Sequence, residues 1–166
     1  KRTRRELHGK LARWLAAQTG LRANDFLSAA ARHFELAGDV SNATEYHARA
    51  AEHARTRMAH EAVLDHVQQA LTLLDKTPRA TGTRLLRMRL LEEREATLDV
   101  LGDRVGQRAD IDALAELAEA QDDNRRRAHA AWRRSALAQR IADYAAMETG
   151  AQQAVEWARR AGADEI

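Results

Sequence analysis

The chain has 166 residues, of which 45% are hydrophobic, only 4% are aromatic and one is proline. This balance favours long helices rich in Ala and Leu over many short strands. The formal net charge of +2, from 27 basic and 25 acidic residues, describes a nearly balanced surface and does not by itself indicate a nucleic-acid partner. Because the sequence has no cysteine, disulfides and thiolate metal sites are excluded, and we expect a cytoplasmic protein.

The sequence gives no sign of a membrane segment. No run reaches the 18 or so consecutive apolar residues that span a bilayer, so we expect no membrane partner. The chain starts at Lys1 instead of Met and stops at Ile166, just after a predicted helix end. We therefore expect a piece excised from a longer protein.

Apolar side chains recur at steps of three or four residues along the chain, which is the period of one helix face. Taken in order, these stripes run through residues 7–15, 27–34, 46–53, 63–74, 88–101, 111–117, 128–138 and 144–158. Pro78 ends the regular pattern after the fourth stripe, and no window shows sustained alternation with a period of two. We predict an all-α fold of about eight helices, a single domain over residues 1–166 with a weak break near 76–82.

A short turn pattern separates the predicted helices. Gly38-Asp39 recurs as Gly102-Asp103, Ala142-Asp143 stands in the same place before the last stripe, and Arg57-Met58 is a weaker intermediate turn. Glycine suits the left-handed position after a helix end, and a short polar side chain can cap the next helix. The predicted N-caps are Asn24 or Asp25, Ser41 and Asp103, and the predicted helix ends are Gly20, Gly38, Gly102 and Gly162. Such short connections predict antiparallel neighbours.

Two segments carry a resemblance to the tetratricopeptide repeat. They are "FELAGDVSNATEYHARA" at residues 34–50 and "IADYAAMETGAQQAV" at 141–155. In the second, the turn and the small residues of the second helix are matched by Asp143, Tyr144, Ala151 and Ala154. The chain departs from that pattern at Ala142, which replaces the turn glycine, and at Gln107, where a small residue is expected. The step of 40 residues from Asp103 to Asp143 also exceeds the usual repeat of about 34 residues.

A broader resemblance covers nearly the whole chain. The segments "RRELHGKLARWLAAQ", "AARHFELAGDVSNATEYHARAAEHA" and "HEAVLDHVQQALTLLDKTP" resemble the region after the ATPase module of large bacterial signal-transduction proteins. The later segment "LGDRVGQRADIDALAELAEAQDDNRRRAHAAW" is similar to the continuing repeats of those proteins, which often also contain an adenylate/guanylate cyclase or a DNA-binding output domain. The resemblance implies a sensor or scaffold segment whose catalytic neighbours lie outside this chain.

We therefore predict a right-handed α-solenoid of antiparallel tetratricopeptide-like helix pairs, in which each stripe packs against its neighbours. The predicted function is non-catalytic recognition of a protein or peptide, including the parent's own ATPase or output domain, on the concave face. Counting back from the turns, the candidate groove residues are Thr44, His47, Arg89, Glu92, Glu93, His129, Trp132 and Arg133. Their mixture of Arg, Glu and His favours a charged partner segment.

Motifs for catalysis or metal binding are incomplete. Gly9-Lys10 lacks the first glycine and the hydroxyl residue of a phosphate-binding loop, because Arg4 and Leu11 occupy those positions. In "HEAVLDH", His60 and His66 are six residues apart and face different sides of a helix, so they do not form a zinc motif. We interpret these histidines as solvent-facing or capping, and His47 and His53 as groove or surface residues. We expect no enzyme activity, no metal and no cofactor.

The basic run Arg125-Arg126-Arg127, followed by His129 and Trp132 to Arg134, supports an alternative function. Arginines beside an exposed tryptophan could grip phosphates and stack bases, so the alternative is a helical nucleic-acid-binding module using residues 125–134. Acidic residues at 110–123 are able to neutralise the run, and Trp132 lies on the apolar stripe. We therefore favour ion pairing within the protein or with a protein partner for the arginines, and core packing for Trp132.

Overall fold

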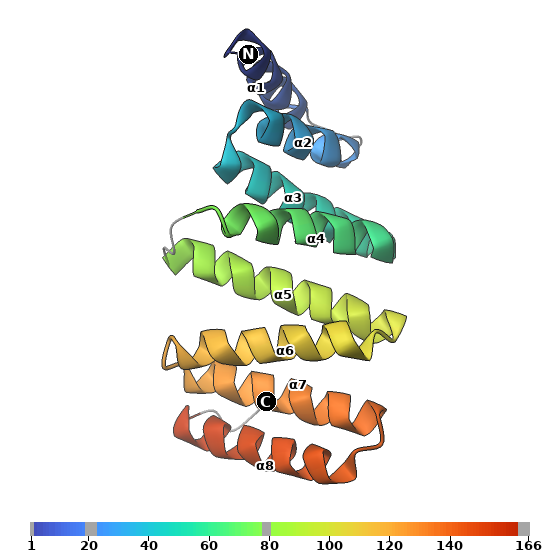
Figure 1. Cartoon of the computed structure of the whole chain (residues 1–166), viewed down its shortest axis with the longest axis vertical. Coiled ribbons are helices and arrows are strands. Elements are labelled where there is room, and N and C mark those ends of the chain that lie inside the picture. Colours follow the sequence, from blue (N-terminus) through green and yellow to red (C-terminus); the bar gives the residue numbers. More distant parts are fainter. Residues whose placement is uncertain (1, 19–22, 78–80, 163–166) are drawn as a thin grey trace. The chain divides into compact units, whose positions relative to one another are not determined.

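The computed structural model describes residues 2–18, 23–77 and 81–162, and every element in these ranges is a helix (Figure 1). In chain order the elements are α1 (Arg2–Ala16), the 3-10 helix η1 (Ala23–Phe26), α2 (Leu27–Ala37), α3 (Val40–Thr56), α4 (His60–Leu74), α5 (Thr81–Leu101), α6 (Arg104–Glu119), α7 (Asn124–Arg140) and α8 (Tyr144–Arg160). The all-α fold predicted from the spacing of apolar residues is confirmed.

The chain divides into two compact units, Lys1–Leu90 and Leu91–Ile166, and the boundary falls inside α5. In the first unit, α1 contacts α2, α2 contacts α3, and α3 contacts α4. In the second unit, α6 contacts α7, and α7 contacts α8. The break predicted near residues 76–82 includes residues 78–80, which lie outside the described ranges.

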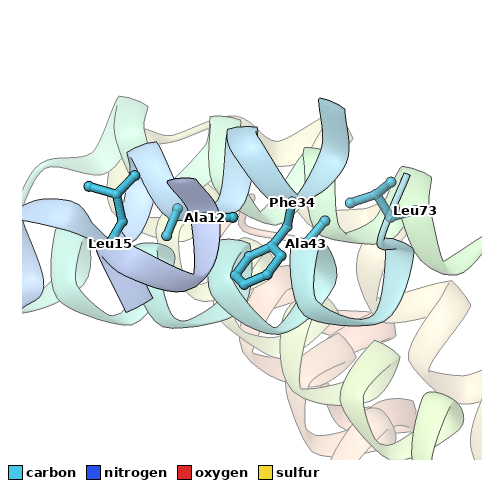
Figure 2. Packing of buried hydrophobic residues seen from close by; sticks show 6 residues of the cluster. Ala12, Leu15, Phe34, Ala43 and Leu73 are labelled. Atoms are coloured by element: carbon cyan, nitrogen blue, oxygen red, sulfur yellow. The ribbon is translucent and has the colours of Figure 1, made fainter. Parts of the chain in front are cut away.

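The core of the first unit is built from small and large side chains of four helices (Figure 2). Ala12 and Leu15 of α1 join Phe34 of α2, Ala43 of α3 and Leu73 of α4 in one buried cluster. The alanines allow neighbouring helix backbones to approach closely, and the larger side chains fill the space between them. This cluster fixes the orientation of α1 on α2.

The stripe predicted for the first helix is mostly not buried. Ala12 and Leu15 are in the core, but Leu7, Leu11 and Trp14 are exposed. The expectation that this stripe packs inside the unit is therefore wrong for three of its residues. The reason is that the face of α1 that contacts α2 is centred on smaller residues, whereas the larger apolar side chains lie on another face.

One turn recurs at five of the connections between helices, before α3, α4, α6, α7 and α8. Five residues with a left-handed backbone each stand two positions before a helix begins, namely Gly38, Met58, Gly102, Asp122 and Ala142, with φ of 77°, 55°, 77°, 51° and 59°. The left-handed geometry ends one helix and redirects the chain into the next. Positions 102, 122 and 142 are 20 residues apart, as are 38 and 58.

The residue after each left-handed position is the N-cap of the following helix. Asp39, Asp103, Asp123 and Asp143 each accept a hydrogen bond from the backbone N–H three residues later, whereas Ala59 has no side-chain acceptor. The predicted caps are thus confirmed at Asp103 and corrected at Ser41, because Asp39 caps α3 and Ser41 lies inside it. At α2 the N-cap is Phe26 and not the predicted Asn24 or Asp25, since η1 precedes the helix. The predicted helix end at Gly20 lies outside the described residues.

Candidate functional site

The second unit contains a network of charged side chains centred on Glu95 of α5. This carboxylate is only 5% exposed. The Gln107 amide of α6 donates a hydrogen bond of 2.7 Å to Glu95 Oε1, and Arg133 of α7 donates one to Glu95 Oε2. A carboxylate taken out of water requires such partners, so Glu95 and Arg133 stabilise each other's charge between α5 and α7.

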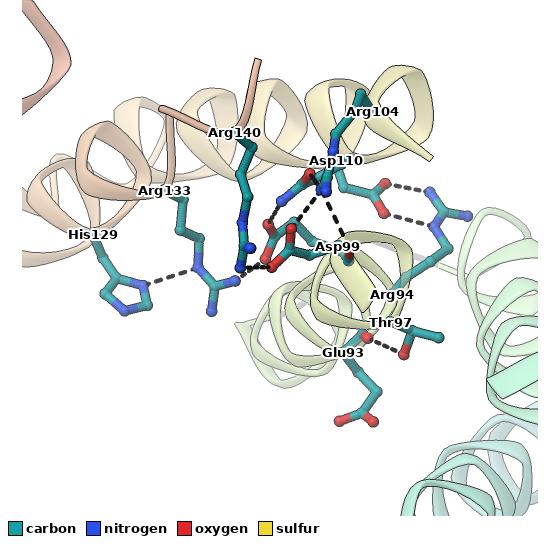
Figure 3. Close-up of polar contacts among 11 residues, drawn as sticks. Glu93, Arg94, Thr97, Asp99, Arg104, Asp110, His129, Arg133 and Arg140 are labelled. Carbon is teal, nitrogen blue, oxygen red and sulfur yellow. Dashed lines mark hydrogen bonds and ion pairs between the residues drawn. The ribbon is translucent and has the colours of Figure 1, made fainter. Parts of the chain in front are cut away.

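One helical turn further along α5, Asp99 extends the network (Figure 3). Arg104 donates a hydrogen bond of 2.5 Å to Asp99 Oδ1, and Arg140 donates one of 2.9 Å to Asp99 Oδ2. Arg104 also donates a hydrogen bond of 2.8 Å to the Gln107 side-chain oxygen, and this bond connects Asp99 and Arg104 to Glu95. Three helices are thereby joined by a continuous chain of charge-assisted hydrogen bonds, which are stronger than neutral ones.

A separate ion pair ties α5 to α6. Arg94 donates two hydrogen bonds to the buried carboxylate of Asp110, with Nε 2.9 Å from Oδ2 and Nη2 2.6 Å from Oδ1 (Figure 3). The hydrogen bond to Asp110 raises the pKa of Arg94, against the opposing effect of burial. This two-pronged geometry holds both side chains in one orientation.

Beside the network, the surface of the second unit is hollowed between α5 and α7. The hollow has a volume of about 640 Å³ and its lining includes Ala96 of α5 and Ala136 of α7. Because these two residues contribute only methyl groups, the space above them is left unfilled. Trp132, Gln139 and Arg140 line the same hollow. The hollow therefore offers small apolar patches beside an aromatic ring and hydrogen-bonding groups.

The side chains that line this hollow differ in how far they are exposed to solvent. Trp132 is 50% exposed, so the prediction that it packs in the core is wrong. The Arg140 side chain is also more exposed than not, while Asp99 is mostly covered. A guanidinium has five N–H donors, so Arg140 can donate to an incoming carboxylate while keeping its bond to Asp99. The accessible charge is therefore positive.

His129 supports the exposed tryptophan. Its ring stacks on Trp132 with centroids 5.7 Å apart and an angle of 26° between the planes. The Arg133 Nε atom lies 3.5 Å from His129 Nδ1 (Figure 3). Burial and then the charge of Arg133 lower the pKa of His129, although Glu92 and Glu95 act in the opposite direction. At neutral pH the ring is uncharged, which lets Nδ1 face the guanidinium as an acceptor.

The first unit has a smaller hollow of about 290 Å³ between α3 and the first part of α5. Glu52 and His53 of α3 and Arg89 of α5 are among its lining residues. A hydrogen bond from Arg55 lowers the pKa of Glu52. This hollow presents both charge signs on an exposed surface, so it favours no particular charge in a ligand.

The predicted groove residues are distributed between these hollows and the helix interfaces. Arg89 lines the hollow of the first unit, and Trp132 and Arg133 line that of the second. Thr44 and His47, in contrast, are buried. Their placement on an open groove is therefore corrected, because Thr44 donates to the Val40 carbonyl and His47 pairs with a histidine of α4.

The remaining predicted residues lie close to the network. Glu92 and Glu93 are half-buried on α5, where Glu92 acts on His129 through its charge and the Glu93 carbonyl accepts a hydrogen bond of 2.8 Å from the Thr97 hydroxyl (Figure 3).

The interpretation of His66 as solvent-facing is wrong, since it is half-buried and its Nδ1 atom lies 3.1 Å from that of His47.

The arginine run is largely engaged in ion pairs within the second unit. Arg126 Nε lies 3.1 Å from Asp123 Oδ2. Arg127 Nη2 lies 2.9 Å from Glu119 Oε2, and Arg134 Nη2 lies 2.8 Å from Asp112 Oδ1. Intramolecular pairing, predicted from the acidic residues before the run, is confirmed for these three arginines. Their charges are therefore partly neutralised before any partner arrives.

Several residues of the network were missed by sequence reasoning: Glu95, Asp99, Arg104, Gln107 and Arg140. The signal for part of it was present, because Glu95 and Asp99 are four residues apart, as are residues on one helix face. Gln107 also stood out as a polar residue where the tetratricopeptide pattern has a small one, and its amide bonds Glu95. Which arginine each carboxylate meets depends on how α7 packs, which spacing does not reveal.

No family model matches the chain, and no curated protein sequence matches it significantly. Over residues 2–18, 23–77 and 81–162, His, Asp and Glu side chains form no group of three or more that could hold a metal ion. In the same ranges, no helix combines the length and the apolar character needed to cross a membrane.

Proposed function

We propose that this chain is a non-catalytic protein-interaction and regulatory domain that binds a partner segment in the hollow between α5 and α7. The observation that carries the proposal is the half-exposed Trp132, which stacks on His129 and lines that hollow together with the Glu95–Arg133 ion pair. Exposed tryptophan and arginine beside a hollow are typical of residues that contribute most to protein interfaces.

The network gives this surface a fixed shape before a partner binds. Glu95, Arg133, Asp99 and Arg140 are hydrogen-bonded to one another or to Gln107, so their rotamers are restricted. When a partner binds, the side chains of this surface therefore lose less conformational entropy than those of a flexible surface would. A role as a recognition surface accounts for the charged residues without assigning them a chemical reaction.

The wider context of the proposal comes from the sequence resemblance. We assign the chain to the tetratricopeptide-like repeats of a cytoplasmic, bacterial, multidomain signal-transduction ATPase, arranged as antiparallel helix pairs in a right-handed solenoid. The recurring turns at positions 102, 122 and 142 support a repeat of two helices, although its 40 residues exceed the usual tetratricopeptide length of about 34. The partner is then a protein or peptide, including the parent's own ATPase or output domain.

The test is to fill the hollow. Peptides selected from a random library against the wild-type chain are re-measured by fluorescence anisotropy against Ala136→Leu, which places a larger side chain in the hollow. We expect the affinity to fall by about tenfold or more, which corresponds to at least about 1.4 kcal/mol. The matched control is Ala109→Leu at an exposed alanine of α6, which leaves affinity unchanged. Selected peptides that bind both variants equally would contradict the proposal.

A second measurement separates protein from nucleic-acid recognition. Replacing Arg125, Arg126 and Arg127 with Ala leaves peptide binding unchanged on this proposal. Tight binding of random-sequence RNA or DNA that weakens with salt and is lost in the triple variant would favour the nucleic-acid alternative.

A further inference from the structure

The outer face of α1 carries three large apolar side chains in single file. Leu7, Leu11 and Trp14 are 61%, 40% and 58% exposed. They are spaced by four and three residues, so they lie one above another on the helix surface. Single exposed apolar residues are common, but an aligned set that includes a tryptophan marks an interaction surface.

This face is distinct from the face that α1 uses inside the first unit. Gly9, Ala12 and Leu15 are buried, and a Cβ atom on Gly9 would lie 3.7 Å from the Ala37 Cβ atom of α2. The small side chains thus bring α1 close to α2, and the orientation of the helix is fixed. The exposed apolar line is held outward as a consequence of this packing.

The shape of the exposed line indicates the kind of surface that covers it. At 100° per residue, Leu7, Leu11 and Trp14 span about 60° of the helix circumference. A stripe this narrow, with alternating steps of three and four, is the seam by which one helix packs against another. A helix that lies in a lipid surface presents a broader apolar face.

The charge of α1 indicates the charge of the partner. The segment Arg2–Ala16 has five basic residues and one acidic residue, a net charge of +4, whereas the whole chain carries +2. On the helical wheel, Arg4 and Lys10 lie about 60° to either side of Leu7, and both are exposed. A partner with acidic residues beside its own apolar seam complements this arrangement, whereas a second copy of the chain would bring two basic segments together.

We propose that the Leu7–Leu11–Trp14 face of α1 is a docking surface for an acidic amphipathic α-helix of another protein. The apolar seam of that helix covers the three side chains, and its flanking carboxylates meet Arg4 and Lys10. This surface is independent of the hollow between α5 and α7, so either proposal can fail without the other.

The probe is a synthetic peptide of about three heptads with Leu at the a and d positions and Glu at the e and g positions. Binding to the full chain is measured by fluorescence anisotropy, beside a peptide of the same length with Lys in place of Glu. We expect the Glu peptide to bind at least about tenfold more tightly. The double variant Leu7→Ser/Leu11→Ser loses this binding and keeps its helical circular dichroism, because both residues are exposed. Val105→Ser on α6, which also removes an exposed apolar side chain, is the matched control.

A charge-reversal variant tests the electrostatic part. Arg4→Glu/Lys10→Glu is expected to prefer the Lys peptide, while Arg159→Glu, at an exposed position of α8, keeps the wild-type preference. Three results would overturn the proposal. The first is equal binding of the Glu and Lys peptides. The second is that the wild-type chain binds phosphatidylserine vesicles and not the Glu peptide, and that the Leu7/Leu11 variant loses this vesicle binding. The third is that the wild-type chain sediments as a dimer, which the Leu7/Leu11 variant dissociates.

Discussion

Gly150 of α8 lies directly against the backbone of Ser135 of α7. A Cβ atom on Gly150 would lie 3.0 Å from both the N and Cβ atoms of Ser135 and 3.1 Å from its Cα atom. The Ser135 hydroxyl also donates a hydrogen bond of 2.7 Å to the Met147 carbonyl on the neighbouring turn of α8. The absence of a side chain at one residue and a hydroxyl at the other hold these two helices at a short distance.

This contact predicts that Gly150→Ala destabilises the protein. Alanine is usually better than glycine in a helix interior by about 1 kcal/mol. Here the added methyl group meets backbone atoms, so α7 and α8 must separate, and we expect the free energy of unfolding to fall by about 1–3 kcal/mol. Urea unfolding provides the measurement. The control is Gly82→Ala on α5, where, among the described residues, the added Cβ would meet no heavy atom within 4 Å apart from its own and adjacent residues and the nearby backbone of α5. Equal gains in stability in both variants would mean that α7 and α8 are not in close contact.

The turn before α4 predicts a stabilising change. Ala59 stands where four other turns have an aspartate cap, and Met58 has the left-handed φ of 55° that glycine adopts more easily. Ala59→Asp is expected to raise the free energy of unfolding by about 1 kcal/mol, because its carboxylate can accept from the first turn of α4. Met58→Gly in the same chain adds to this gain. The converse change, Asp143→Ala, should cost a similar amount in urea unfolding, and no loss there would show that the caps contribute little.

These turns show which parts of the fold follow from sequence alone. A left-handed glycine followed by a capping aspartate acts within a few residues, so Gly38-Asp39 and Gly102-Asp103 were both recognised as turns, although the cap of α3 was assigned to Ser41 instead of Asp39. The same turn at Asp122-Asp123 was missed, because both residues were grouped with the acidic residues that precede the arginine run. Its place could have been found from spacing, since it lies 20 residues from the turns on either side.

The faces of the helices were harder to predict, for a physical reason. An apolar stripe shows that a segment is helical, but the neighbouring helices decide which part of the stripe is covered. Trp132 and Leu7 lie on clear stripes and are nevertheless exposed, while His47 is buried. Burial of a polar residue depends on a partner from another helix, and here His66 lies 19 positions away in the sequence.

The ion pair between Arg94 and Asp110 predicts a large loss of stability when one partner is removed. Asp110→Ala leaves the half-buried guanidinium without its two hydrogen bonds, and we expect a loss of about 3–5 kcal/mol. The double variant Arg94→Met/Asp110→Leu should recover most of this loss, because no charge is left unpaired. The comparison is Asp112→Ala, which breaks the exposed pair with Arg134 and should cost less than about 1 kcal/mol. Similar losses in both single variants would contradict a special role for the buried pair.

The last prediction concerns pH and the two histidines that join α3 to α4. His47 Nδ1 lies 3.1 Å from His66 Nδ1, and His66 Nε2 lies 2.8 Å from the Ser28 hydroxyl. A single proton must lie between the two Nδ1 atoms, so charging both rings removes that hydrogen bond and adds repulsion. Burial, followed by the charge of His66, lowers the pKa of His47, against Glu35 and Asp65. Burial lowers the pKa of His66, against Asp65.

Because both pKa values are lower in the folded protein than the ordinary value of about 6.5, the unfolded chain binds more protons below that pH. The free energy of unfolding is therefore expected to be level above about pH 6.5 and to fall as the pH is lowered towards 5, by at most about 1.4 kcal/mol per pH unit for each histidine. His47→Gln should flatten this decrease in urea unfolding measured between about pH 5 and 7.5. His60→Gln, at the start of α4 and outside this histidine pair, should leave it unchanged. An identical acid slope in the wild type and in His47→Gln would show that the pair does not control acid stability.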